Sequence, residues 1–226
     1  MEINPDKLYA VITGDIIGSS GLPDFERKKL YEVMRSGGDA LRAAHPKAVP
    51  LDIDIFRGDS WQLLVADPGM SIRTGLLYRL YIKAHMQNRV DTRMAFAVGR
   101  ISFIPERRVS EGEGRAFYLS GKALEEMEAF CSMAFSLDDP DVKSEVFNSI
   151  VILLDAVVSD LSEKQSLALY GALLNQTQNR IATLWNPAVK QQTVAKLLKR
   201  AQWRHLEKVL YLFENSLYRL FPDYTA

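Results

Sequence analysis

Hydrophobic and polar residues in the first part of the chain follow strand-like and helix-like patterns in turn. Residues 8–12 form an apolar run before a segment rich in glycine and serine, which predicts a buried strand and a loop. Residues 25–44 place apolar side chains on one helical face and predict a helix. Residues 51–66 alternate as strand, turn and strand, so we expect a hairpin with Asp59 in its bend.

The same reasoning continues to about residue 130. We expect a second helix over residues 71–88, a strand over 93–103 and a short helix over 119–130. The order is therefore β, α, β, β, α, β, α. Strands in runs mixed with helices predict an α/β fold of the α+β sandwich type, with a mainly antiparallel sheet and helices on one face.

An acidic segment, residues 136–144, interrupts the periodic patterns on both sides and contains Pro140. Everything beyond it has helical periodicity. We therefore expect an α/β domain over residues 1–136, a linker and connecting helix over 137–160, and an all-α domain over 161–226.

The beginning of the last unit has the pattern of a helix-turn-helix. Helices are expected over residues 162–174, 177–185 and 189–201. A small residue in the supporting helix (Ala182), a turn at Pro187 and an apolar residue in the recognition helix (Val194) are the features that this motif requires. The alternative is a three-helix bundle that only packs against the first domain.

Polar side chains on the expected recognition helix have the chemistry of DNA binding. Lysine contacts phosphate or guanine, and glutamine pairs with the major-groove edge of adenine. The candidates for binding duplex DNA are Lys190, Gln191, Gln192, Thr193, Lys196 and Lys199.

The distribution of charge agrees with DNA binding by the tail. The whole chain has 28 basic and 28 acidic residues, but residues 161–226 hold nine basic and four acidic ones. This leaves +5 on the tail and −5 on residues 1–160. A basic unit of this kind favours contact with phosphates.

An apolar stripe runs along the last predicted helix. It consists of Leu206, Leu210, Phe213, Leu217 and Leu220, spaced by four, three, four and three residues. The stripe could pack against the helix expected over 141–160 or against a second copy. Because palindromic DNA suits two-fold proteins, we expect a homodimer.

Composition limits where the protein works. A single cysteine, Cys131, excludes an internal disulfide framework, and the first residues lack the order of a secretion signal. The longest strongly apolar run is broken by Asp155 and is too short to span a bilayer. We expect a cytoplasmic protein that does not enter the membrane.

Two aspartates in the first part could share a cation. Asp15 and Asp59 each follow a glycine, which lets the backbone turn or approach a ligand closely. Magnesium binds through one or two carboxylates and keeps its other positions for water and phosphate oxygens. The alternative is that both aspartates only complete turns.

Four segments carry a resemblance to a known family. GDIIGSS, RGDSWQLL, TRMAFAVG and GRAFYLSGKAL, at residues 14–20, 57–64, 92–99 and 114–124, resemble in order four motifs of class III nucleotidyl cyclases. The GDII opening, the GD-x-x-Q-x-L hairpin and the tail more closely resemble the SatD family, in which a cyclase-like domain precedes a helix-turn-helix.

This resemblance implies roles for particular residues. It makes Asp15 and Asp59 the ligands of magnesium. It places the backbone of Ile16, Ile17, Gly18 and Ser19 at the phosphates of a nucleoside triphosphate. Lys122, the remaining nucleotide-binding candidate, stands where cyclases have an arginine that stabilises transition-state charge, and lysine lacks the planar fork of arginine.

Departures from the cyclase pattern bear on activity. Tyr118 replaces an asparagine that orients ribose, and Ile55 replaces a lysine that selects the base. These changes argue against cyclisation but leave nucleotide binding intact. We therefore expect a DNA-binding, transcriptional regulator with a cyclase-like metal-nucleotide domain. The alternatives are an active cyclase or nucleotidyltransferase, and a degenerate domain for protein contacts.

Overall fold

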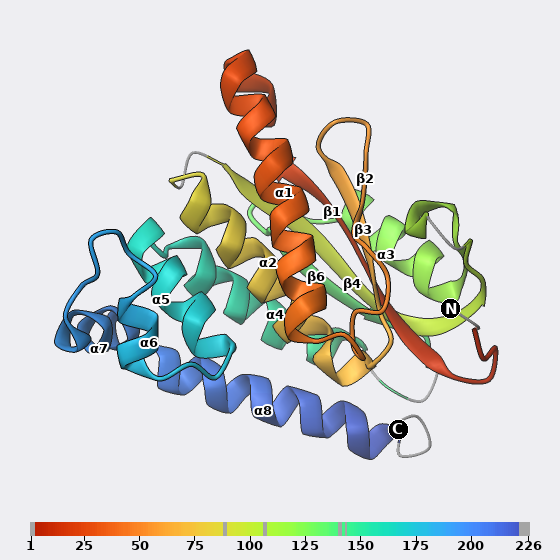
Figure 1. The fold of residues 1–226 in the computed structure, drawn as a ribbon. Helices are drawn as coiled ribbons and strands as arrows, with labels where there is room; N and C mark the ends of the chain where they lie inside the picture. The colour runs from red at the N-terminus through yellow and green to blue at the C-terminus, as the bar shows by residue number, and fades with distance from the viewer. Residues whose placement is uncertain (1–2, 88–89, 106–107, 140–141, 143, 222–226) are drawn as a thin grey trace.

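A computed structural model describes residues 3–87, 90–105, 108–139, 142 and 144–221. The described chain contains a six-stranded sheet in the order β2-β3-β1-β4-β5, with β6 beside β4 (Figure 1). The strands are β1 (Leu8–Ile17), β2 (Asp54–Phe56), β3 (Ser60–Val65), β4 (Asp91–Phe103), β5 (Glu113–Gly114) and β6 (Met133–Leu137). Among these pairings only that of β4 with β6 is parallel, so the expected mainly antiparallel sheet is confirmed.

Helices make up most of the rest of the described chain. They are α1 (Asp24–Ala44), α2 (Ser71–His85), α3 (Arg115–Glu125), α4 (Ser144–Ser159), α5 (Glu163–Leu173), α6 (Gln178–Ala182), α7 (Gln191–Arg200) and α8 (Trp203–Leu220). Short 3-10 turns are η1 (Ser19–Gly21), η2 (Pro68–Met70) and η3 (Val109–Glu111). The expected helix-rich second half and the hairpin around Asp59 are both present.

Helices cover both faces of the sheet, so the expectation of helices on one face is wrong (Figure 1). α1, α2 and α4 lie on one side and share a core with Ile12 and Phe96. α3 lies on the other side, where Ala116 packs with Val11 and Ile101. The central strand β1 is apolar at successive positions, and such a strand needs cover on both faces.

Strand β6 was not predicted. Its short alternation buries Met133, Phe135 and Leu137, and it pairs in parallel with β4. The expected boundary at residues 136–144 therefore begins inside a strand. Pro140, Asp141 and Lys143, which belong to that boundary, lie outside the described residues.

The C-terminal helices pack directly on the α/β part. Phe213 of α8 meets Phe135 of β6 and Phe147 of α4, with ring centroids 5.2 Å away in each case. Arg73 of α2 holds Glu214 of α8 through Nε and Nη2, at 2.7 and 3.3 Å. One continuous hydrophobic core thus extends from the sheet to α8.

The apolar stripe of α8 is used within the chain. Leu206, Leu210, Phe213 and Leu217 are buried in the core, while Leu220 is exposed. A homodimer held by this stripe is therefore wrong, although a homodimer through another surface stays a prediction. None of the described helices is long and apolar enough to cross a membrane.

Candidate functional site

Asp15 and Arg93 face each other across two central strands. They are direct partners in the antiparallel register of β1 and β4, so their side chains project from the same face of the sheet. The guanidinium donates two hydrogen bonds to the carboxylate, from Nε to Oδ1 at 3.0 Å and from Nη2 to Oδ2 at 2.6 Å. The hydrogen bond to Asp15 raises the pKa of Arg93 above its ordinary value, so the arginine stays charged.

The hairpin brings Asp59 to the same place. Its Oδ2 accepts a hydrogen bond of 2.6 Å from the Ser19 hydroxyl, which ties the β2–β3 bend to the turn after β1. Gly58 and Arg57 adopt positive φ angles of 89° and 53°, a conformation that Gly58 takes without strain and that lets the chain reverse tightly before Asp59.

A hollow of about 390 Å³ lies between these groups. It is lined by Asp15, Ile16, Ile17, Gly18, Ser19, Ser20, Asp59, Arg93, Ala129, Cys131 and Ser132. The structure thus brings together both candidate metal ligands and the four candidate phosphate-binding residues of the β1 turn. Burial raises the pKa of the Cys131 thiol, as do the nearby carboxylates of Asp155 and Glu128, so the thiol is neutral at pH 7.

Lys122 lies elsewhere. It lines a separate hollow on α3 with Glu126 and Phe135, and its ammonium is 3.7 Å from the Glu126 carboxylate. Tyr118, one turn earlier, is mostly exposed and lies under the guanidinium of Arg115. The structure therefore does not bring Lys122 together with Asp15 and Asp59, and the two hollows share only Cys131.

Gly14 serves packing inside the strand. A side chain there would come within 2.5 Å of the Trp61 ring and of the Arg93 carbonyl oxygen. Trp61 is fully buried beside Tyr78, and its indole N–H donates to the Thr92 hydroxyl at 2.9 Å. Gly14 thus makes room for a tryptophan that fixes the strand carrying Asp15.

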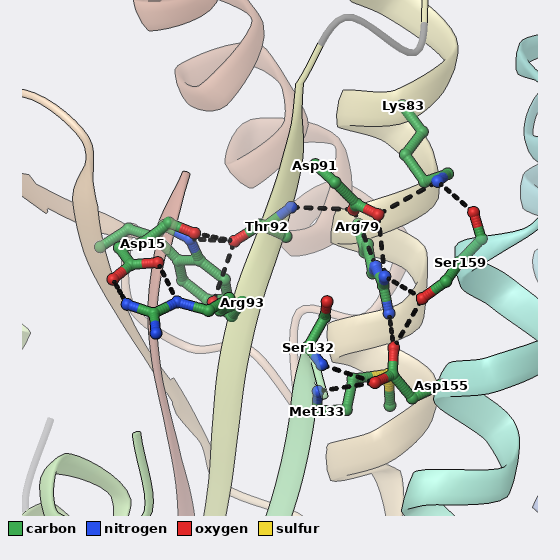
Figure 2. A network of polar contacts seen from close by, with 11 residues as sticks. Asp15, Arg79, Lys83, Asp91, Thr92, Arg93, Ser132, Met133, Asp155 and Ser159 are labelled. Atoms are coloured by element: carbon green, nitrogen blue, oxygen red, sulfur yellow. Dashed lines mark hydrogen bonds and ion pairs between the residues drawn. The ribbon is translucent and has the colours of Figure 1, made fainter. Parts of the chain in front are cut away.

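Thr92 joins this site to a second cluster of charges across β4 (Figure 2). Its hydroxyl donates to the Asp15 carbonyl oxygen at 2.7 Å, and its N–H donates to the Asp91 carboxylate at 2.8 Å. Asp91 in turn receives both Nε and Nη2 of Arg79 at 2.8 Å. The site is therefore connected to the interior on the α2 and α4 side.

The second cluster is buried. Arg79 is fully buried and also donates to Asp155 at 2.6 Å and to Ser159 at 2.8 Å, both on α4. Lys83 adds a contact of 3.1 Å to Asp91. Burial alone would raise the pKa of Asp91, but the hydrogen bond and charge of Arg79, with the charge of Lys83, lower it overall. Asp91 therefore stays ionised at neutral pH.

Asp155 also supports one wall of the hollow. Its Oδ2 accepts the backbone N–H groups of Ser132 and Met133 at 2.6 and 3.2 Å. Ser132 lines the hollow that contains Asp15. Helix α4, which follows the expected domain boundary, thus holds part of the candidate site in place.

Comparison with known proteins gives structural neighbours for part of the chain. No family model matches, and no curated protein matches, so membership of the SatD family is not confirmed. The neighbours are guanylyl and adenylyl cyclases. The guanylyl cyclase Cya2 is 15% identical and has a TM-score of 0.41, with 53% of this chain and 70% of that chain covered.

Two adenylyl cyclases give similar values. A bacterial light-regulated adenylyl cyclase is 16% identical with a TM-score of 0.40, and the match covers 57% of this chain but only 42% of that enzyme. The adenylyl cyclase CyaB from P. aeruginosa is 17% identical with a TM-score of 0.40, covering 57% of this chain and 76% of that one. Scores this low transfer neither activity nor ligand to the protein.

The donor set of the hollow fits a magnesium ion under one condition. Asp15 and Asp59 offer carboxylate oxygens, and magnesium needs one or two such ligands. No group of three or more acidic, histidine or cysteine side chains suited to a metal occurs among the described residues. Because Arg93 donates to both oxygens of Asp15, a metal ion there must use the lone pairs that Arg93 leaves free or displace it.

Helix α7 presents the expected polar face, but the turn between α6 and α7 begins earlier than expected. α6 ends at Ala182, so the expected end at residue 185 is wrong. The Ala182 carbonyl accepts the N–H of Val189 at 3.1 Å, which replaces the bond that would continue the helix. Val194 and Leu198 of α7 are buried, and the six DNA-binding candidates are exposed: Lys190, Gln191, Gln192, Thr193, Lys196 and Lys199.

Proposed function

We propose that the protein binds the phosphates of a nucleoside triphosphate, with magnesium, in the hollow between the β1 turn and the β2–β3 hairpin. The observation that carries this proposal is the convergence of Asp15, Asp59 and the Gly18 turn on one hollow. The two carboxylates would hold the metal ion. The turn would lie against the phosphate oxygens, where a glycine allows close approach of the backbone.

The charge of the hollow makes the metal necessary. The acidic and basic side chains that line it are Asp15, Asp59 and Arg93, so its formal net charge is −1. The negative charge of the hollow would repel a triphosphate. A divalent cation between the carboxylates and the phosphates attracts both and overcomes this repulsion. Nucleotide binding should therefore require the metal.

Replacing either aspartate should remove most of the binding. We expect Asp15→Asn and Asp59→Asn each to weaken magnesium-dependent binding of a non-hydrolysable triphosphate analogue by about 10- to 100-fold, because each removes a charged metal ligand. Titration calorimetry measures the affinity. Asp52→Asn, which changes a largely exposed carboxylate on a loop, is the matched control. Unchanged affinity in both site variants would show that the hollow is not the binding site.

A second candidate function, binding of duplex DNA, rests on the exposed face of α7. Lys196 and Lys199 lie on this face with no ion-pair partner among the described residues, while Val194 and Leu198 lock the helix into the core. Gln191 donates to Gln178 of α6 at 2.5 Å, so its amide is oriented at the start of the helix. We propose that this face contacts phosphates through lysines and base edges through glutamines, as a transcriptional regulator requires.

Salt dependence tests the DNA proposal. In the full-length protein, Lys196→Ala or Lys199→Ala should reduce the slope of log affinity against log salt by about one unit, because one phosphate contact and its counterions are lost. Gln191→Ala or Gln192→Ala should instead lower discrimination between sites by about 1–3 kcal/mol. Selection from random DNA followed by salt-titrated anisotropy measures both effects. Lys28→Ala on α1 serves as the exposed control, and an absence of binding to any duplex at low salt would refute the proposal.

A further inference from the structure

A further hollow lies in the tail, where α6 and α7 meet the start of α8 (Figure 1). Its volume is about 580 Å³, within the range of sites that hold small ligands. Gln202 joins α7 to α8 in a left-handed conformation with φ of 56°, and side chains from the end of α7 and the beginning of α8 line the same space. We call this space the tail hollow.

The tail hollow is basic. Lys199 of α7 and Arg204 of α8 line it, and neither has an ion-pair partner among the described residues. No acidic side chain of the described chain lines it, so its formal net charge is +2 with His205 neutral. The hollow beside Asp15 has a formal charge of −1. The tail hollow therefore attracts an anion without the help of a metal ion.

Hydrogen bonds orient two further polar side chains of the tail hollow. His205 Nδ1 donates to the Gln202 amide oxygen at 3.0 Å, which orients the imidazole ring next to Arg204. Gln178 Oε1 accepts a hydrogen bond of 2.5 Å from Gln191, and the amide nitrogen of Gln178 has no partner among the described residues. That nitrogen is left to donate to a ligand.

One wall of the tail hollow is apolar. Trp203 lines it together with Leu198 and Ala195, and the indole, which is partly buried, packs against the core. Nucleobases and other flat rings stack on aromatic side chains of this kind. An aromatic wall beside two cationic side chains therefore suits a flat ring that carries phosphate groups.

The shape of the tail hollow favours a small ligand over duplex DNA. Lys190 and Lys196 of the proposed DNA face are exposed on α7 and do not line the hollow. A duplex is a thick rod whose phosphates meet protruding side chains. A concave space between three helices instead encloses a molecule of limited size.

We infer that the tail hollow binds a small molecule that carries phosphate groups and a flat ring, without a metal ion. Lys199 and Arg204 contact the phosphates through charge-assisted hydrogen bonds. His205 and the Gln178 amide add hydrogen bonds, and Trp203 covers the ring. This site is separate from the proposed magnesium site at the β1 turn and does not depend on it.

Calorimetry of the full-length protein with ADP and with pyrophosphate, both in EDTA, tests the inference. EDTA removes the divalent cations that the proposed triphosphate site requires, so failure of that site does not affect this measurement. We expect ADP to bind about tenfold more tightly than pyrophosphate, because only ADP has a base that stacks on Trp203. Trp203→Leu should remove this advantage and leave the affinity for pyrophosphate unchanged, which also shows that the variant is folded.

Two further variants test the charged side chains. Lys199→Gln and Arg204→Gln should each weaken binding of ADP and of pyrophosphate about tenfold, as loss of one charge-assisted contact implies. Lys208→Gln is the matched control, because it makes the same change of charge on α8. The Lys208 ammonium lies 5.3 Å from the centre of the Tyr211 ring, outside the tail hollow. Its loss should change both affinities by no more than about twofold, since exposed charges at a distance are screened.

Three results would overturn the inference. The first is an absence of ADP binding to the wild-type protein in EDTA. The second is an equal loss of affinity in Lys208→Gln and Arg204→Gln, which would mean that the ligand responds only to the general charge of the tail. The third is an Arg204→Gln variant that keeps its affinity for ADP but binds duplex DNA with a weaker salt dependence, which would assign the tail hollow to the DNA face.

Discussion

Arg79→Ala is expected to lower the free energy of unfolding by about 3–5 kcal/mol, because it removes the guanidinium that pairs with the buried carboxylate of Asp155 and the largely buried one of Asp91. Denaturant unfolding measures this loss. Arg42→Ala, which breaks an exposed pair with Asp52, should cost no more than about 1 kcal/mol and is the matched control. Equal losses in the two variants would contradict the assignment of Arg79 as a buried ionic anchor.

A double-mutant cycle refines this prediction. The double variant Arg79→Met, Asp155→Asn should lose less free energy of unfolding than the sum of the two single variants. The second change removes the carboxylate charge that the first leaves without its arginine. Loss of Asp155 should also loosen the N–H groups of Ser132 and Met133. Hydrogen exchange at these two amides reports on the wall of the hollow separately from global stability.

Phe213→Ala should have an effect of similar size through the packing of α8 on β6 and α4. Phe213 is buried between Phe135 and Phe147, and removal of such a ring costs about 3–5 kcal/mol. Because its partners lie on β6 and α4, the loss should destabilise the sheet and the tail together. Leu212→Ala, on the exposed side of the same helix, should change stability much less.

Tryptophan fluorescence can show whether the two parts unfold together. Trp61 lies in the core beneath the sheet, and Trp185 and Trp203 lie in the tail. In a variant with both tail tryptophans changed to phenylalanine, the fluorescence of Trp61 should follow the same transition as the far-ultraviolet circular dichroism. Two separate transitions would instead show that residues 161–226 form an independent unit.

The sequence predicted the helices and strands better than it predicted the contacts between them. Periodicity placed the hairpin, α2 and β4 close to their observed bounds, whereas the apolar run that predicted β1 ended at residue 12 and the strand continues to Ile17. It missed β6 because five residues of alternation are too short a signal, and it placed the end of α6 three residues late. The bond from Val189 to the Ala182 carbonyl, which ends that helix, is a contact that periodicity cannot show.

The candidate site was foreseen in part. Spacing and family resemblance selected Asp15, Asp59 and the turn after β1, and the structure brings these together at one hollow. The role of Arg93 was missed, although a lone arginine near the start of an otherwise apolar strand was a visible signal. Its pairing with Asp15 depends on strand register, which one sequence does not reveal.

Buried charges carried a similar signal. Asp155 interrupts the most apolar run of the chain, and in the sequence it served only to exclude a membrane span. The structure shows that it pairs with Arg79 from another helix, 76 residues earlier. A charged residue in the middle of an apolar helix face implies a buried partner, but which residue fills that place depends on the packing of α2 against α4.

The hydrogen bond between Tyr218 and Asp67 forms only after α8 has been synthesised, long after Asp67. The tyrosine hydroxyl donates to the Asp67 carboxylate at 2.9 Å across 151 residues, and the Tyr218 ring covers Gly69. While the ribosome has yet to release α8, the apolar surfaces of Phe135 and Phe147 lack their final cover. A nascent chain that has not yet reached α8 therefore exposes an incomplete apolar core, which makes it a client for chaperones that shield emerging polypeptides.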